Sequence, residues 1–220
     1  MSESKESLET RVISAGAPGA IELGALALAR GELVVFPTDT VYGVGCDYRQ
    51  RQAIDLLYWA KQRPYEMPIP VLVSSLSHVQ QVAQTLSDSF EALAERYWPG
   101  GLTLIVPRAP ALPDLLTAGG DTVAVRMPDH PTALALIEAA GGAVAATSAN
   151  RSGQPSPVTA ADALADLNGR VHLVLDGGTC PQGVASSIID ISVAPPRLLR
   201  LGPLDQETLL EALPDLTVPE

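Results

Sequence analysis

The chain has 220 residues, two cysteines and a formal net charge of −11 at pH 7. An acidic balance of this size argues against non-specific nucleic-acid binding, whose affinity comes mainly from neutralising phosphates. The cysteines show neither zinc-ligand spacing nor a disulfide framework, and no apolar run is long enough to cross a membrane. We therefore expect a cytoplasmic protein with free thiols and no membrane association.

Helix-forming and strand-forming segments alternate along most of the chain. Helices are predicted where good helix formers follow a Pro, Ser or Thr start, at residues 20–30, 50–61, 77–84, 87–97, 131–140, 159–167 and 205–213. Strands are predicted from short apolar runs, at residues 33–36, 69–73, 102–106, 121–126, 144–146, 171–175, 187–191 and 198–201. This order predicts an α/β fold, with one twisted, open mixed sheet flanked by helices.

One folded domain is expected over residues 16–204, since no linker or internal repeat interrupts this stretch. The polar residues 1–15 before it are expected to be flexible. Residues 205–220 are expected to form a C-terminal helix and tail.

Polar segments lie next to the ends of several predicted strands. PTDTVYG follows residues 33–36, RMPDHP follows 121–126 and TSANRSGQPSP follows 144–146, while KQRP precedes 69–73. Ligands of open α/β sheets bind at the carboxyl ends of strands, so we expect these segments to meet there in one site. The stretch 147–157 is rich in small hydroxyls and turn residues, which suit a phosphate or an adenine edge. The alternative for this stretch is a Ser/Pro-rich surface loop.

Lys61 and Arg63 lie at the end of a predicted helix, immediately before Pro64. Two cations at this point suit a phosphate or a carboxylate, although cations at a helix C-terminus also complement the helix dipole. Lys61 is expected to be partly exposed and to add little stability.

Arg126 ends an otherwise apolar strand, where an arginine either binds an anionic ligand or pairs with a nearby acid, here Asp121 or Asp129. Arg200 is placed in the same way and is either anion-binding or a solvated strand end. Asp39, in PTDT, is either a metal-binding or orienting carboxylate or an Asx-turn residue. Neither a Walker A loop nor a Rossmann fingerprint occurs in the sequence, so a nucleotide site here needs another design.

Taken in order, several segments resemble the YrdC-type threonylcarbamoyl-AMP synthase family. They are PTDTVYGVG (37–45), KQRP (61–64), WPGGLTLIV (98–106), TVAVRMP (122–128), SANRSGQPSP (148–157), SSIID (186–190) and LRLG (199–202). They contain the family's KxR and SxN signatures, as Lys61/Arg63 and Ser148/Asn150. The resemblance covers about residues 18–203 and is to the single-domain type.

The resemblance implies a YrdC-like fold with a large substrate cleft and an L-threonylcarbamoyladenylate synthase activity, a nucleotidyltransferase reaction. L-Threonine, bicarbonate and ATP would give threonylcarbamoyl-AMP and pyrophosphate, with Mg²⁺ accompanying ATP. The product would pass to a downstream tRNA threonylcarbamoyl transferase complex, for threonylcarbamoyl-adenosine modification of tRNA. Such a transfer depends on positioning and charge neutralisation more than on a covalent nucleophile.

The resemblance also assigns roles to the matching positions. The residues that would contact L-threonine are Thr38 or Thr40, Arg126, Ser148, and Ser186 or Ser187. The residues that would contact ATP are Lys61, Arg63, Thr122, Asn150, Ser156 and Arg200. The catalytic centre would consist of Lys61, Arg63, Ser148 and Asn150, and no residue is assigned to a metal.

The chain departs from the family pattern at two places. At Leu72 the family often has a hydrophilic residue, and where this chain has SSIID (186–190) the family usually has STVVD. A related carbamoyl-adenylate enzyme, as in hydrogenase maturation, is disfavoured because the chain has no CxxC. Two other functions stay open. One is a double-stranded-RNA-binding module, with a weak RNA contact through Arg49, Arg51 or Arg63; the charge of −11 argues against it. The other is a diverged paralogue without synthase activity, which the two retained signatures disfavour.

Overall fold

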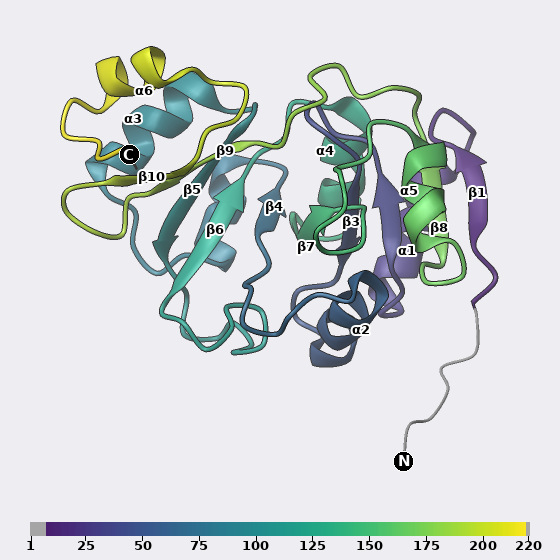
Figure 1. Ribbon diagram of the computed structural model, residues 1–220. Helices are drawn as coiled ribbons and strands as arrows, with labels where there is room; N and C mark the ends of the chain where they lie inside the picture. The colour runs from purple at the N-terminus through teal and green to yellow at the C-terminus, as the bar shows by residue number, and fades with distance from the viewer. Residues whose placement is uncertain (1–7, 219–220) are drawn as a thin grey trace.

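One mixed sheet of ten strands runs through the protein, in the order β1-β8-β2-β3-β7-β4-β6-β5-β9-β10 (Figure 1). The structure is a computed structural model that describes residues 8–218. The strands are β1 Arg11–Ser14, β2 Val34–Phe36, β3 Gly43–Cys46, β4 Val71–Val73, β5 Leu102–Pro107, β6 Thr122–Arg126, β7 Ala143–Ser148, β8 Leu173–Asp176, β9 Ser187–Asp190 and β10 Arg197–Arg200. The helices are α1 Ala20–Ala29, α2 Arg51–Lys61, α3 Asp88–Tyr97, α4 Pro131–Ala139, α5 Ala160–Leu167 and α6 Gln206–Ala212.

The predicted α/β fold is confirmed, with differences in three elements. Residues 11–14 form β1, which pairs in parallel with β8, so the flexibility predicted for residues 1–15 is wrong there. Residues 1–7 and 219–220, to which the predicted flexible terminus and tail extend, lie outside the described residues. The helix predicted at 77–84 is a 3₁₀ helix over Leu76–Gln81.

The third difference is β3, which sequence reasoning missed because its sequence, GVGC, contains two glycines. The strand is nevertheless fully buried between β2 and β7. At Gly45 a Cβ atom would lie 2.8 Å from Val144 Cγ1 and 3.0 Å from the Ala145 carbonyl oxygen. Glycine therefore permits the close approach of β3 and β7.

Helices cover the two faces of the sheet unequally (Figure 1). On one face, α2, α3, α5 and α6 contribute to the larger core cluster, through residues such as Leu57, Phe90 and Leu167. On the other face, α1 and α4 form a smaller cluster that includes Leu28 and Leu136. No helix within residues 8–218 is long and apolar enough to cross a membrane.

Strand β6 shows how the sheet presents polar groups on the α1/α4 side. Val123 and Val125 belong to the larger core cluster on the opposite side. Because side chains alternate along a strand, Thr122, Ala124 and Arg126 face the α1/α4 side. The predicted residues Thr122 and Arg126 therefore share one face of the sheet.

Candidate functional site

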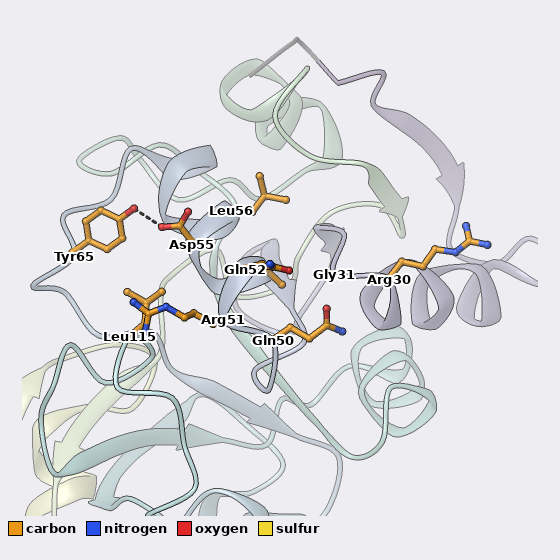
Figure 2. Close-up of a pocket in the computed structure, with 10 residues that line it drawn as sticks. Arg30, Gly31, Gln50, Arg51, Gln52, Asp55, Leu56, Tyr65 and Leu115 are labelled. Atoms are coloured by element: carbon orange, nitrogen blue, oxygen red, sulfur yellow. Dashed lines mark hydrogen bonds between the residues drawn. The ribbon is translucent and has the colours of Figure 1, made fainter. Parts of the chain in front are cut away.

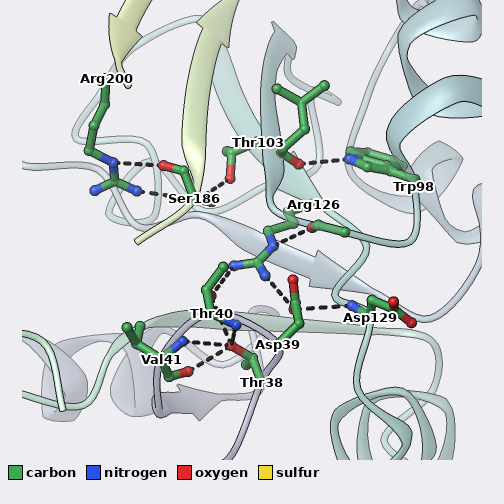
Figure 3. A network of polar contacts seen from close by, with 12 residues as sticks. Thr38, Asp39, Thr40, Val41, Trp98, Thr103, Arg126, Asp129, Ser186 and Arg200 are labelled. Atoms are coloured by element: carbon green, nitrogen blue, oxygen red, sulfur yellow. Dashed lines mark hydrogen bonds and ion pairs between the residues drawn. The ribbon is translucent and has the colours of Figure 1, made fainter. Parts of the chain in front are cut away.

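The loop between β2 and β3 is held in place by the hydroxyl of Thr38. Thr38 Oγ1 accepts hydrogen bonds from the backbone N–H groups of Thr40 and Val41, both at 3.2 Å, and donates to the Val41 carbonyl oxygen at 2.6 Å. Thr38, rather than Asp39, therefore makes this turn, so the Asx-turn alternative for Asp39 is wrong. The carboxylate of Asp39 and the hydroxyl of Thr40 are left to point toward Arg126 (Figure 3).

Arg126 is 6% exposed, and every nitrogen of its guanidinium donates to a neighbour. Nε donates to the Gly100 carbonyl oxygen and Nη1 to Thr40 Oγ1, both at 2.8 Å. Nη2 donates to Asp39 Oδ1 at 2.5 Å. Burial lowers the pKa of Arg126, and the charge of Asp39 opposes this shift. Asp121 and Asp129, the acids offered as the alternative to an anionic ligand, do not pair with Arg126; its partner is Asp39.

The contact between Asp39 and Arg126 also corrects the expectation that the polar segments meet at a shared carboxyl edge. The pairs β2–β3, β3–β7 and β7–β4 are antiparallel and β4–β6 is parallel, so β2 and β6 run in opposite directions. The loop after β2 therefore reaches Arg126 across the sheet. Gly100 and Ser186 lie at the amino ends of β5 and β9, which run opposite to β6.

Ser186 belongs to a second hydrogen-bonded group close to Arg126 (Figure 3). Its hydroxyl lies 2.8 Å from Thr103 Oγ1 and accepts a hydrogen bond from Arg200 Nη2 at 3.2 Å. Arg200 Nε donates to the Ser186 carbonyl oxygen at 2.8 Å. Burial lowers the pKa of Arg200. The positive charge of Arg200 in turn contributes to the lowered pKa of Arg126.

The two candidate serines differ in their surroundings. Ser187 is fully buried, and its hydroxyl accepts a hydrogen bond from the Gly202 N–H at 3.0 Å. Ser186, rather than Ser187, therefore joins the polar group around the arginines. Sequence reasoning missed Thr103, whose signal is the single hydroxyl within the otherwise apolar run LTLIV.

Lys61 is 1% exposed, so the prediction of a partly exposed lysine is wrong. Its ammonium group donates to the backbone carbonyl oxygens of Ser148 and Asn150. Its own carbonyl oxygen accepts from the Ser152 N–H at 2.9 Å. Burial, with a smaller contribution from the charge of Arg63, lowers the pKa of Lys61 to about 7. Lys61 thus fixes residues 148–152 against the end of α2.

Asn150 and Ser152 each bury a polar atom without a partner among the described residues. Asn150 Nδ2 donates to the carbonyl oxygens of Arg151 and Gln154, at 2.9 and 2.7 Å. Asn150 Oδ1 and Ser152 Oγ are buried and unpaired. These atoms are able to bind a ligand beside Lys61.

The structure gathers most predicted residues into two neighbouring groups. The first contains Thr38, Thr40, Arg126, Ser186 and Arg200, and the second contains Lys61, Ser148 and Asn150. The groups are joined through Tyr42, whose carbonyl oxygen accepts from the Ala149 N–H and whose N–H donates to the Pro157 carbonyl oxygen, both at 2.8 Å.

The remaining predicted positions are less closely connected. Arg63 donates to the carbonyl oxygens of Met67 and Pro68, at 3.1 and 2.9 Å, and so holds the chain before β4. Ser156 is half-buried beside Pro157. Leu72 pairs in register with Arg126 and is 7% exposed. It packs in the α1/α4 cluster as an apolar side chain.

A cavity of about 730 Å³ lies beside the first turns of α2, away from these groups. Its lining includes Arg30, Arg51 and Tyr65, and none of the residues predicted to contact L-threonine or ATP. Figure 2 shows the Tyr65 hydroxyl directed at Asp55, to which it donates at 2.5 Å. Within residues 8–218, no cluster of three His, Cys, Asp or Glu side chains is arranged to hold a metal ion.

The fold and these side chains define a mixed-sheet α/β protein whose site gathers arginines, a lysine and hydroxyl groups, as an anionic ligand requires. The family model for Sua5/YciO/YrdC proteins, described as "Telomere recombination", matches residues 26–202. The chain belongs to this family, which confirms the resemblance seen in its motifs.

Several relatives are similar over most of this chain. The threonylcarbamoyl-AMP synthase of Pyrococcus abyssi is 39% identical over 90% of this chain and 58% of its own length. That of Bacillus subtilis is 41% identical over 91% of this chain and 58% of its own length. The putative threonylcarbamoyl-AMP synthase of Mycobacterium tuberculosis is 43% identical over 85% of this chain and 86% of its own length. The chain thus spans little more than half the length of the first two relatives.

Solved structures show the same architecture. Pyrococcus abyssi Sua5 complexed with L-threonine matches 96% of this chain and 61% of its own chain, with a TM-score of 0.89 and 38% identity. Escherichia coli YciO matches 94% of this chain with a TM-score of 0.80. At 23% identity, the second match shows the fold alone.

Proposed function

We propose that the protein is an L-threonylcarbamoyladenylate synthase, a nucleotidyltransferase that makes threonylcarbamoyl-AMP and pyrophosphate from L-threonine, bicarbonate and ATP. The observation that carries the proposal is the buried Arg126, whose orientation is fixed by Gly100, Thr40 and Asp39. A guanidinium with a fixed orientation matches the planar geometry of a carboxylate. Relatives named threonylcarbamoyl-AMP synthase, and a relative's structure complexed with L-threonine, support it.

Arg126 takes the carboxylate of threonine, since its guanidinium still has N–H groups free for a ligand. Thr40 and Ser186 line the same position, from the loop after β2 and from the start of β9. In the first step the threonine nitrogen, as the free amine, forms a bond to the carbon of bicarbonate. A C–O bond of bicarbonate breaks, the oxygen leaves as water with a proton from the nitrogen, and a carbamate remains. The carboxylate contact holds this nitrogen in place during the attack.

In the second step a carbamate oxygen bonds to the α-phosphorus of ATP, and the bond from that phosphorus to the bridging oxygen breaks as pyrophosphate leaves. Arg200 and Arg63 supply positive charge for the phosphates, and Lys61 adds to it when its ammonium group is protonated. Asn150 and Ser152 offer unpaired polar atoms to the nucleotide. Mg²⁺, if it accompanies ATP as in other phosphoryl-transfer reactions, would neutralise charge on the phosphates; the described residues contain no cluster of three acids, histidines or cysteines that would hold it.

The product is an activated carbamoyl-adenylate, which hydrolyses unless an acceptor consumes it. We assign that step to a downstream tRNA threonylcarbamoyl transferase complex, in keeping with threonylcarbamoyl-adenosine modification of tRNA. We assign the protein itself to the cytoplasm, where ATP, threonine and tRNA are found together.

The test is release of pyrophosphate by the purified protein in ATP, Mg²⁺ and bicarbonate, with and without L-threonine. Release that requires threonine, and that serine or glycine does not replace, is the expected result. Release that ignores the amino acid would show an ATP hydrolase instead. No release from protein that binds ATP would favour the diverged paralogue.

A further inference from the structure

Asp39 is a buried acid of the site, and the proposed reaction assigns it no role. Its side chain is 4% exposed. Oδ1 accepts from Arg126 Nη2 at 2.5 Å and from the Asp129 backbone N–H at 3.1 Å. Oδ2 is buried and has no partner among the described residues. An unpaired buried carboxylate oxygen is unfavourable, so its retention beside Arg126 points to a ligand that donates to it.

Neither a turn-forming role nor a metal-binding role accounts for the Asp39 carboxylate. The turn after Pro37 is made by the hydroxyl of Thr38, so it does not use this carboxylate. A metal site is also unsuitable, because a lone carboxylate beside the guanidinium of Arg126 is a poor set of ligands for a hard cation. Within residues 8–218, no cluster of acids or histidines completes such a set.

We propose that Asp39 recognises the amino group of the amino-acid substrate: Oδ2 accepts hydrogen bonds from the ammonium group while Arg126 beside it receives the carboxylate. This inference rests on the proposed function. An α-amino acid carries an ammonium group and a carboxylate on the same carbon atom, and the Asp39–Arg126 pair presents the two complementary charges side by side. The pair is built before the ligand arrives, which limits the entropy lost on binding.

The fixed position of Arg126 supports this geometry. Gly100 and Thr40 hold its Nε and Nη1, so the guanidinium does not depend on Asp39 alone for its orientation. The second oxygen of Asp39 is therefore available to a ligand without loss of the Arg126 site. If Asp39 served only to anchor Arg126, its second oxygen would be expected to have a hydrogen-bond partner too, but Oδ2 has none among the described residues.

Because Oδ2 is buried, a ligand reaches it only if a covering segment moves. Residues 177–185 lie against this loop through two backbone hydrogen bonds. The Gln182 N–H donates to the Asp39 carbonyl oxygen at 3.1 Å, and the Gly183 N–H donates to the Thr40 carbonyl oxygen at 2.9 Å. Both bonds use backbone groups, so the segment is able to separate without breaking the pair of Asp39 and Arg126.

The test measures dissociation constants by titration calorimetry for three ligands: L-threonine, its deamino analogue with a hydroxyl in place of the ammonium group, and threoninol, which lacks the carboxylate. Wild-type protein should bind threonine about 10- to 100-fold more tightly than the deamino analogue, as expected for a charge-assisted contact. Asp39→Asn should lose that preference and keep the preference for threonine over threoninol.

Asp129→Asn is the matched control, since Asp129 is exposed and contacts Asp39 only through its backbone N–H. It removes one negative charge nearby and should keep both preferences. If Asp39→Asn does not melt cooperatively, Asp39→Ser replaces it in the same titrations, with the same expected losses.

The inference is overturned if wild-type protein binds the deamino analogue as tightly as threonine, if Asp39→Asn keeps the preference for the ammonium group, or if it weakens all three ligands equally. The last result would give Asp39 a structural part only. Wild-type protein that binds none of the three ligands overturns the proposed reaction as well.

Discussion

Replacing Lys61 by Met tests the burial of its ammonium group, on which the second group of site residues depends. The substitution keeps an unbranched side chain and removes the donor to the carbonyl oxygens of Ser148 and Asn150. In the wild type the pKa of Lys61 falls from 10.5 to about 7, with burial as the main cause. That fall corresponds to about 5 kcal/mol of lost preference for the charged form.

The pH dependence of stability follows from this shift. Between pH 7 and about 10 the unfolded chain keeps the lysine proton while the folded chain has released it, so the unfolded state binds more protons. The folded state therefore gains stability as pH rises through this range. From about pH 7 to about pH 9, linkage gives the wild type about 2 kcal/mol of unfolding free energy relative to Lys61→Met, which lacks the titrating group.

The assay is urea unfolding of both proteins at about pH 7, 8 and 9, with the difference in unfolding free energy taken at each pH. Subtraction removes the contribution of every titrating group that the two proteins share. A difference that does not change with pH would refute the reasoning, because it would mean that folding does not lower the pKa of Lys61.

Two further substitutions test the first group. Arg126→Lys keeps a positive charge beside Asp39 but loses the planar fork, so it should raise KM for threonine about tenfold or more with little change in KM for ATP; equal increases in steady-state assays would remove the threonine assignment. Thr103→Val removes the hydroxyl that contacts Ser186, so it should lower kcat/KM about tenfold while Thr103→Ser restores it; unchanged kinetics in Thr103→Val would show that Ser186 needs no such support.

The sequence was sufficient to predict the layered fold, because its buried strands are short and well separated. Its resemblance to the family named most residues of the two groups that the structure gathers. It did not predict β3, since glycine hides a strand whose presence depends on close contact with β7. It also did not predict β1, whose residues are mostly exposed and whose place depends on backbone pairing with β8.

The partner of Arg126 shows a second limit. Asp39 lies far from Arg126 in sequence, and the contact requires a loop to cross the sheet between strands that run in opposite directions. The sequence offered Asp121 and Asp129 as partners because they lie near Arg126, whereas the tertiary fold brings Asp39 there instead. The burial of Lys61 has the same origin, because residues 148–152 close over the end of α2.

The proposed reaction joins bicarbonate, threonine and ATP in one product at this site. The most direct measurement is mass spectrometry of the nucleotide products after incubation with ATP, Mg²⁺, L-threonine and carbon-labelled bicarbonate. We predict an adenylate that contains both threonine and one labelled carbon, and that is absent when threonine is omitted. A threonyl-adenylate without the label, or AMP alone, would contradict the proposed reaction.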